Sequence, residues 1–120
     1  MWAIINKPGA YNGAHIHPGS SWSGVYYVQA PRDCGNIEFI DPRTVHVMNQ
    51  PIFAEGTSRP PEFWTKVEYQ PRDGICYLFP SFLYHAVKEN LSEAKGDRSD
   101  RIIVSFNLSQ SRIKNMKRSS

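Results

Sequence analysis

Cysteine is scarce in this chain of 120 residues, and no apolar run is long enough to cross a lipid bilayer. The two cysteines, Cys34 and Cys76, form no C-x-x-C pair, so the sequence does not indicate a disulfide framework. Signal and transit peptides are also lacking. We therefore expect a cytoplasmic protein with no membrane partner.

An excess of charge of one sign is absent from most of the chain. The formal net charge is +3, but four of the 14 basic residues lie close together at Arg112, Lys114, Lys117 and Arg118, with no acidic residue among them. The rest of the chain carries ten basic and 11 acidic residues and is nearly neutral. We expect residues 110–120 to form a solvated or frayed basic tail, and we expect no nucleic-acid partner.

Signals for long helices are missing as well. Nine prolines and eight glycines are scattered along the chain, between short apolar or alternating runs. This pattern predicts about eight short strands and little helix in one all-β domain over residues 1–109, a β-sandwich or jelly roll. The chain is strand-like from its first residues, which suits a minimal domain or a piece of a longer one. Besides a strand that holds the histidines at 15 and 17, the expected strands are residues 2–5, 23–29, 36–40, 64–69, 75–79, 85–87 and 101–108.

Histidines are few, but two of the four stand one residue apart in the sequence Ala-His-Ile-His-Pro. On a strand, His15 and His17 would point to the same face and could converge on one ion. Neutral imidazole suits iron, copper, nickel and zinc. His85 is the best candidate for a third ligand because it opens a strand after a buried one, whereas we expect His46 to be a surface residue. The alternative is that His15 and His17 are polar residues at the end of an ordinary strand.

The last expected strand has two different faces. One set of alternating residues is entirely apolar, and we predict that it faces the core: Ile102, Val104, Phe106 and Leu108. The other set suits a polar cavity: Arg101, Ile103, Ser105 and Asn107. There Arg101 could grip a carboxylate through a bidentate pair. A salt bridge from Arg101 to Asp97 or Asp100 at the edge of the strand is the alternative.

The strand at 23–29 divides in the same way. Ser23, Val25 and Tyr27 share its more polar face. Tyr27 is therefore a candidate to place a hydroxyl in a pocket. The alternative is a core tyrosine whose hydroxyl is satisfied within the protein.

The order of these parts is similar to that of a known superfamily. The chain resembles the 2-oxoglutarate- and Fe(II)-dependent oxygenases over residues 2–108, and more narrowly a group of small proteins assigned to that class in marine bacteria and their phages. The segments that carry the resemblance are His15-Ile16-His17-Pro18, Ser23 to Val28, Gly35 to Arg43, Gly74 to His85 with Leu78-Phe79-Pro80-Ser81, and Arg101 to Asn107.

The resemblance implies a double-stranded β-helix, which is a jelly roll, with Fe(II) held by His15, His17 and His85. It implies that Arg101 binds the far carboxylate of 2-oxoglutarate with help from Tyr27. Where many relatives have a serine two residues after the arginine, this chain has Ile103, so the second donor would be Tyr27 or Ser23.

His17 stands where the superfamily has a carboxylate. Three neutral ligands would leave the iron one unit more positive, and the dianion 2-oxoglutarate would bring it to neutrality. The implied reaction converts 2-oxoglutarate to succinate and CO2 while a C–H bond of a small molecule or protein side chain is hydroxylated. Arg43 and Asn107 are the expected substrate contacts, and residues 44–63, with Phe53 and Arg59, the expected lid or substrate loop.

Three other functions fit the same residues. The first is a cupin-like three-histidine dioxygenase that uses no 2-oxoglutarate, and the second is a metal-dependent isomerase or hydrolase. The third is a non-catalytic jelly-roll binding module in which the histidines are structural. Exposed edge strands in a short chain also make a homodimer an expected assembly.

Overall fold

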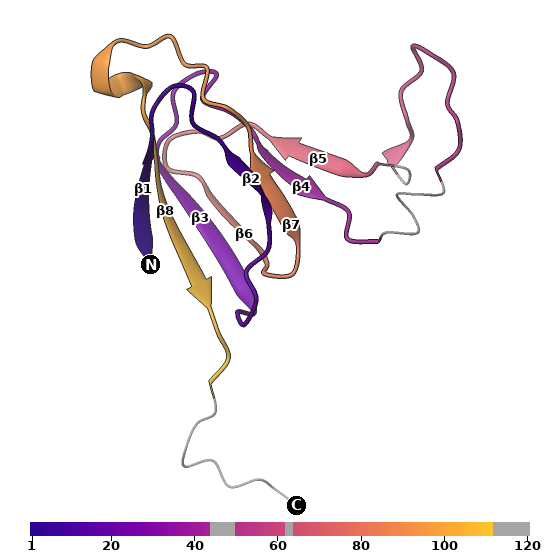
Figure 1. The fold of residues 1–120 in the computed structure, drawn as a ribbon, viewed down its shortest axis with the longest axis horizontal. Helices are drawn as coiled ribbons and strands as arrows, with labels where there is room; N and C mark the ends of the chain where they lie inside the picture. The colour runs from indigo at the N-terminus through magenta and orange to yellow at the C-terminus, as the bar shows by residue number, and fades with distance from the viewer. Residues whose placement is uncertain (44–49, 62–63, 112–120) are drawn as a thin grey trace, which may run out of the picture.

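The computed structural model describes residues 1–43, 50–61 and 64–111. Its strands form two antiparallel sheets, in the orders β1-β8-β3-β6 and β2-β7-β4-β5 (Figure 1). Apart from β4 and β5, consecutive strands lie in opposite sheets, which is the topology of a jelly roll. The expected double-stranded β-helix is thus confirmed. The strands are β1 (Trp2–Asn6), β2 (Asn12–His15), β3 (Trp22–Gln29), β4 (Ile37–Ile40), β5 (Lys66–Tyr69), β6 (Cys76–Pro80), β7 (Tyr84–Val87) and β8 (Arg101–Leu108).

Helical structure in the described part of the chain is limited to short 3-10 segments such as Gly96–Ser99. No helix among these residues has the length and apolar character needed to span a membrane. The strands are instead rich in β-branched and aromatic residues, and turns with proline or glycine end them. Gly74, for example, closes the expected turn before β6 with a φ of 80°, which glycine adopts without a steric cost.

The core lies between the two sheets. Tyr27 and Ile103 come from one sheet and Ile37 from the other, and each is at most 4% exposed. Aromatic rings continue this core toward β7, because Phe79 packs edge-on against Phe39 with ring centroids 4.9 Å apart. The buried face of β3 is the one that carries Ser23, Val25 and Tyr27, as expected for residues that reach the interior.

The prediction that the apolar set of β8 faces the core was wrong. Arg101, Ile103 and Ser105 are buried at 0%, 4% and 9% exposure, so this partly polar set faces the core. The apolar set that was predicted to do so lies on the outer face of the sheet: Ile102, Val104, Phe106 and Leu108. Alternation identifies which residues share a face, but it does not show that the more apolar face is the inner one.

The strand predicted around the histidine pair is shorter than expected. β2 ends at His15, and His17 lies in the segment that follows, where its backbone N–H donates to the carbonyl of Ser81 at 3.1 Å. Pro18 and Gly19, which has a φ of 84°, then turn the chain toward β3. Strand alternation is therefore not what brings the two imidazoles together.

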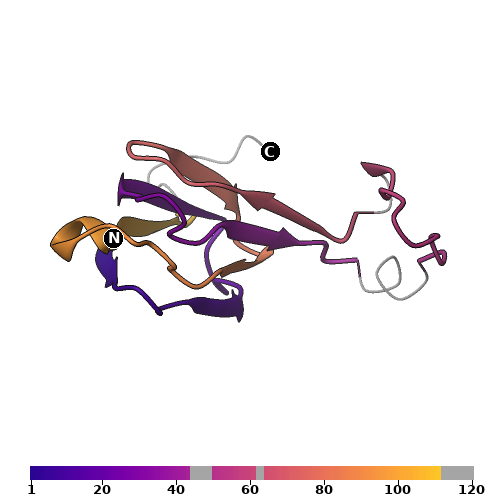
Figure 2. The ribbon, with the colours of Figure 1, turned by 90° about the horizontal axis from the view of Figure 1, so that it is seen from above.

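The connection between β4 and β5 is long and irregular, as expected. Its described part extends away from the two sheets in both views of the ribbon (Figures 1 and 2). Phe53 and Arg59 lie in it, and the Arg59 guanidinium stacks over the Phe53 ring at 5.3 Å. Residues 44–49, with His46, residues 62–63 and most of the basic tail, 112–120, lie outside the described residues.

Candidate metal centre

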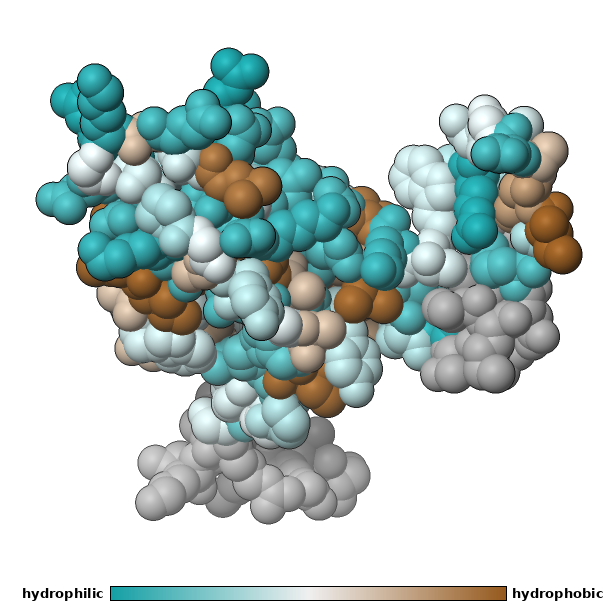
Figure 3. Space-filling view, turned by 45° about the horizontal axis from the view of Figure 1, so that its top comes forward, coloured by the Kyte–Doolittle hydropathy of each residue, from teal (hydrophilic) through white to brown (hydrophobic). Residues whose placement is uncertain are grey.

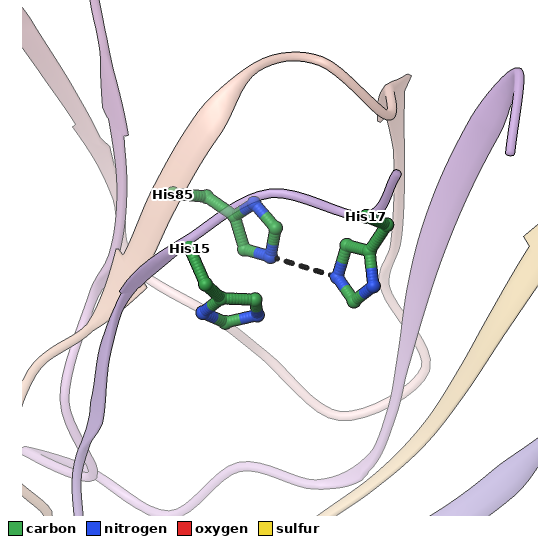
Figure 4. A group of neighbouring side chains, drawn as sticks. All are labelled: His15, His17 and His85. Carbon is green, nitrogen blue, oxygen red and sulfur yellow. Dashed lines mark hydrogen bonds between the residues drawn. The ribbon is translucent and has the colours of Figure 1, made fainter. Parts of the chain in front are cut away.

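Three histidines meet at one end of the space between the sheets. His15 at the end of β2 is paired directly with His85 in β7, and the segment after β2 brings His17 beside them. Their rings point toward one another (Figure 4), and one candidate ligand atom from each lies within 4.8 Å of the other two. The group runs from exposed His15 through half-buried His17 to buried His85, so it is open to solvent on one side.

The spacing of two of these rings matches that of ligands on a common ion. The Nε2 atoms of His17 and His85 are 3.3 Å apart, and the rings are nearly parallel, with an interplanar angle of 17°. Two nitrogens that each lie about 2.1 Å from one ion are about 3.0 Å apart in octahedral geometry and about 3.4 Å apart in tetrahedral geometry. The geometry of the pair therefore fits a bridging cation.

Backbone carbonyls fix the tautomers of two of the imidazoles. His85 donates from Nδ1 to the carbonyl of Leu83 at 3.1 Å, and His15 donates from Nδ1 to the carbonyl of Gly13 at 2.6 Å. Each Nε2 then carries a lone pair that faces the other histidines. Hydrogen bonds of this kind orient metal-ligating histidines in known metal sites.

Burial keeps the inner histidines neutral. The pKa of His85 is lowered to about 4, mainly by desolvation and also by the neighbouring His15 and His17, against the opposing effect of the Leu83 carbonyl. Desolvation and the nearby His15 also lower the pKa of His17. Near neutral pH both rings therefore offer lone pairs without first losing a proton, which is what a metal ligand requires.

The histidines line a cavity of about 150 Å³. Ser23, Ser105 and Asn107 add polar groups to its wall, and Ile103 and Phe79 add apolar ones. The expected site residues Ser23 and Asn107 thus lie in the same cavity as the histidines. Arg101, Tyr27 and Arg43 are not part of its lining.

A chain of hydrogen bonds joins Ser23 and Asn107 to a residue that the sequence analysis assigned no role. Ser23 Oγ donates to Asn107 Oδ1 at 2.9 Å, and its other partner is Ser81 Oγ at 2.8 Å. Ser81 is 1% exposed and also holds the backbone of His17 through its carbonyl. The signal in the sequence was a small polar residue directly after a buried strand, but nothing in the sequence indicates its partners.

Arg101 lies deeper, beyond the far end of β7. Its side chain is fully buried, and Nη1 donates to the carbonyls of Cys34 and Lys88. Lys88 follows His85 by three residues, which is about 10 Å along a strand. The predicted alternative, a salt bridge to Asp97 or Asp100, is not the contact that Arg101 makes.

Arg101 is nevertheless left with unused hydrogen-bond donors. Within the described residues nothing accepts from its Nε or Nη2, although both atoms are buried. Desolvation lowers the pKa of Arg101, and the nearby Tyr27 and Cys34 counteract this. Burial also raises the pKa of Tyr27, so its phenol stays protonated. A buried cation with two unsatisfied donors fits an anionic ligand such as a carboxylate.

Arg43 stands apart from these groups. It follows β4, is exposed, and pairs with Asp41 through Nη2 and Oδ2 at 2.8 Å.

Asp41 lines a second, larger cavity of about 450 Å³ with Trp64, Tyr69 and Tyr77. Phe79 belongs to the walls of both cavities. Nothing in the sequence predicts this aromatic cavity, because most of its lining comes from three separate strands and the β4–β5 connection.

Gly35 is expected to be essential for holding Arg101 in place. Its φ is 99°, and a Cβ there would lie 2.1 Å from the Lys88 carbonyl oxygen and 2.8 Å from Arg101 Nη1. We expect Gly35→Ala to lower the free energy of unfolding by about 3 kcal/mol, from left-handed strain plus overpacking. Urea unfolding measures this loss.

Gly74→Ala is the matched control, because Gly74 has a φ of 80° and nothing within 4 Å of its Cβ position. It should lose only the cost of the left-handed conformation, about 1 kcal/mol. Equal losses for the two variants would mean that the contacts of Gly35 with Arg101 and Lys88 do not matter.

The fold and the site together define a class. A jelly roll with three converging imidazoles and a buried, unsatisfied arginine has the features of a non-heme metal protein that also binds an anion. The family model described as "Putative 2OG-Fe(II) oxygenase" matches residues 1–107, which is nearly the whole chain. The chain belongs to this family.

A solved structure supports the fold. The non-heme alpha ketoglutarate dependent epimerase SnoN from nogalamycin biosynthesis is similar with a TM-score of 0.56 and 17% sequence identity. The match covers 86% of this chain and 43% of the epimerase chain, so this chain spans less than half the length of the epimerase. At this identity the likeness bears on the fold alone. No curated protein matches the sequence.

Proposed function

We propose that this chain is a 2-oxoglutarate- and Fe(II)-dependent oxygenase that hydroxylates a C–H bond of a small molecule or a protein side chain. The observation that carries the proposal is the pairing of two groups inside one jelly roll. Three histidines whose candidate ligand atoms lie within 4.8 Å of one another share a cavity, and a buried arginine has two unsatisfied donors. The first group suits a divalent metal and the second a carboxylate. Membership of the oxygenase family supports the same function.

In this proposal, His15, His17 and His85 hold Fe(II). All three are neutral ligands, so the charge of the ion is offset by dianionic 2-oxoglutarate rather than by the protein. When both are bound they supply the oxidation of a C–H bond by O2, with release of succinate and CO2. The contribution of the chain is to hold, orient and shield the reacting groups. Leu83 and Gly13 fix the imidazoles through their carbonyls.

Arg101 receives the far carboxylate of 2-oxoglutarate through its free Nε and Nη2. Tyr27, whose phenol stays protonated, is the second donor to that carboxylate. Ser23 remains a candidate for the same role, although its hydroxyl already has partners in Asn107 and Ser81. Asn107 and Arg43 are the proposed substrate contacts, of which Asn107 lines the histidine cavity.

An anaerobic titration tests this function directly. Protein loaded with Fe(II) is titrated with 2-oxoglutarate, and we expect the visible charge-transfer absorption that a chelated keto acid gives with ferrous iron. Glutarate, which lacks the keto oxygen, is the control and should give no band. Iron bound without a band on adding 2-oxoglutarate would contradict the proposal.

The second candidate is a cupin-like three-histidine dioxygenase that uses no 2-oxoglutarate. It is favoured by His17, an imidazole where the superfamily has a carboxylate. Such an enzyme would bind Fe(II) but would not need the free donors of Arg101. A metal-dependent isomerase or hydrolase on the same fold would work without O2. Substoichiometric metal after anaerobic Fe(II) loading would instead favour a non-catalytic binding module.

We also propose that the protein works in the cytoplasm without nucleic-acid or membrane partners. The free thiols of Cys34 and Cys76 suit a reducing compartment. The narrower relationship, to small oxygenases of marine bacteria and phages, rests on the sequence resemblance alone.

A further inference from the structure

The outer face of the β1-β8-β3-β6 sheet is apolar on every strand. Its most exposed side chains lie at 41–61% exposure, and they come from all four strands: Ile5, Trp22, Tyr26, Val28, Leu78 and Leu108. In an antiparallel sheet that has one face in water, that face normally carries polar residues. This sheet therefore has the pattern of one that is covered on both sides.

The apolar surface is continuous across the sheet. Gly24 has no side chain, and the Phe106 ring covers this position. A Cβ built at Gly24 would lie only 2.0 Å from that ring. The four strands are fully described, and none of their outward positions carries a charged side chain. Cys76 lies at the β6 edge of the face and is exposed.

The other sheet offers a comparison within the same molecule. Lys66 and Glu68 alternate with Val67 and Tyr69 along β5, and Glu68 pairs with Lys88 across the surface. Where hydrophobic residues appear on the surface in Figure 3, they lie in separate patches among hydrophilic ones. Scattered residues of that kind are normal on a monomer. The apolar sheet face differs because its residues are contiguous.

We propose that this sheet face is the interface of a homodimer, in which a second copy of the chain packs face to face across a two-fold axis. Four strands at about 4.8 Å spacing and about 24 Å in length give a flat footprint of roughly 450 Å². Two copies would bury roughly 900 Å² of this flat area, and side chains that project from the sheet add to it. This is close to the ~1,000 Å² that marks a biological interface.

The absence of charge argues for a second copy as the occupant. Close to a two-fold axis a residue meets its own copy, so a charged residue at the centre of the face would meet like charge. A face without charge avoids this conflict. Two sheets that pack face to face at about 10 Å are also a common arrangement in β-proteins. This proposal does not depend on the oxygenase function.

Sedimentation velocity with the unmodified chain and two matched double variants tests the interface. We expect the wild type to sediment as a dimer of twice 13.7 kDa at micromolar concentration. Tyr26→Lys/Leu78→Lys puts two charges on the face and should raise the dimer dissociation constant by more than ~100-fold. Tyr11→Lys/Leu91→Lys changes the same residue types at 69% and 63% exposed positions outside the face, and should leave the dimer intact.

The reactivity of Cys76 gives a second measurement that needs no variant. Cys34 is 2% exposed, so a maleimide should label Cys76 first, and the rate should fall as protein concentration rises and the face is covered. A wild-type monomer throughout this concentration range would overturn the proposal, as would a dimer that persists in Tyr26→Lys/Leu78→Lys. A labelling rate independent of concentration would overturn it even if that variant failed to fold.

Discussion

Replacing His85 with alanine is expected to weaken Fe(II) binding by more than ~100-fold, beyond the loss caused by removing only a hydrogen-bond partner of a ligand. His85 is the buried member of the histidine group, and its Nε2 faces that of His17 at 3.3 Å. Its ring is also held by the Leu83 carbonyl, so its lone pair costs little to orient. Anaerobic competition with a coloured chelator measures the affinity.

The matched control is His46→Ala, which removes the remaining histidine of the sequence, expected to be a surface residue, and should leave the Fe(II) affinity unchanged. Thermal unfolding in excess chelator shows whether either variant changes the metal-free protein. If His85→Ala retained Fe(II) affinity within ~10-fold of the wild type, the three histidines would not form the metal site, and the proposed function would lose its basis.

Replacing Arg101 with leucine is expected to weaken 2-oxoglutarate binding by ~30-fold to more than 1,000-fold while Fe(II) binding is retained. Removing one partner of a buried charge pair costs about 2–5 kcal/mol, which corresponds to that range. Arg101 has no acidic partner to compensate its charge among the described residues, and two of its donors are unused. The charge-transfer titration measures the 2-oxoglutarate affinity, and anaerobic competition with the coloured chelator measures the Fe(II) affinity.

Arg32→Leu is the control for Arg101→Leu, because the Arg32 side chain is 92% exposed and lies 4.0 Å from the Asp33 carboxylate. It should leave the titration unchanged. If Arg101→Leu titrated like the wild type, the keto acid would bind without the arginine. If neither protein gave a band although iron was bound, the three-histidine dioxygenase would become the better reading.

The sequence predicted the topology of this protein better than the orientation of its strands. Alternation in β8 grouped Arg101 with Ile103 and Ser105 correctly, but it assigned the apolar face to the core. That assignment assumed that the outer face of the sheet contacts water and is polar, so it fails for a sheet whose outer face is apolar. The same surface that misled the prediction is the one that we propose a second copy covers.

The sequence predicted which histidines form the candidate site, but not how the fold brings them together. The three histidines do come together, but His17 arrives through the loop after β2 and a bond to the Ser81 carbonyl, not through strand alternation. Ser81 itself, and the donors that Arg101 leaves unsatisfied, depend on contacts between distant segments. Such contacts leave no periodic signal, so only the folded structure could identify them.

The pairing of β2 with β7 also has a kinetic consequence. His17 and His85 are 68 residues apart in the sequence, and they meet only when these two strands pair. Closing so long a loop is costly before non-local contacts repay it, so we expect the histidine group to form late in folding. A bound metal then stabilises contacts that are absent from the transition state. Metal should therefore extend the lifetime of the native state by slowing unfolding, and leave the folding rate almost unchanged.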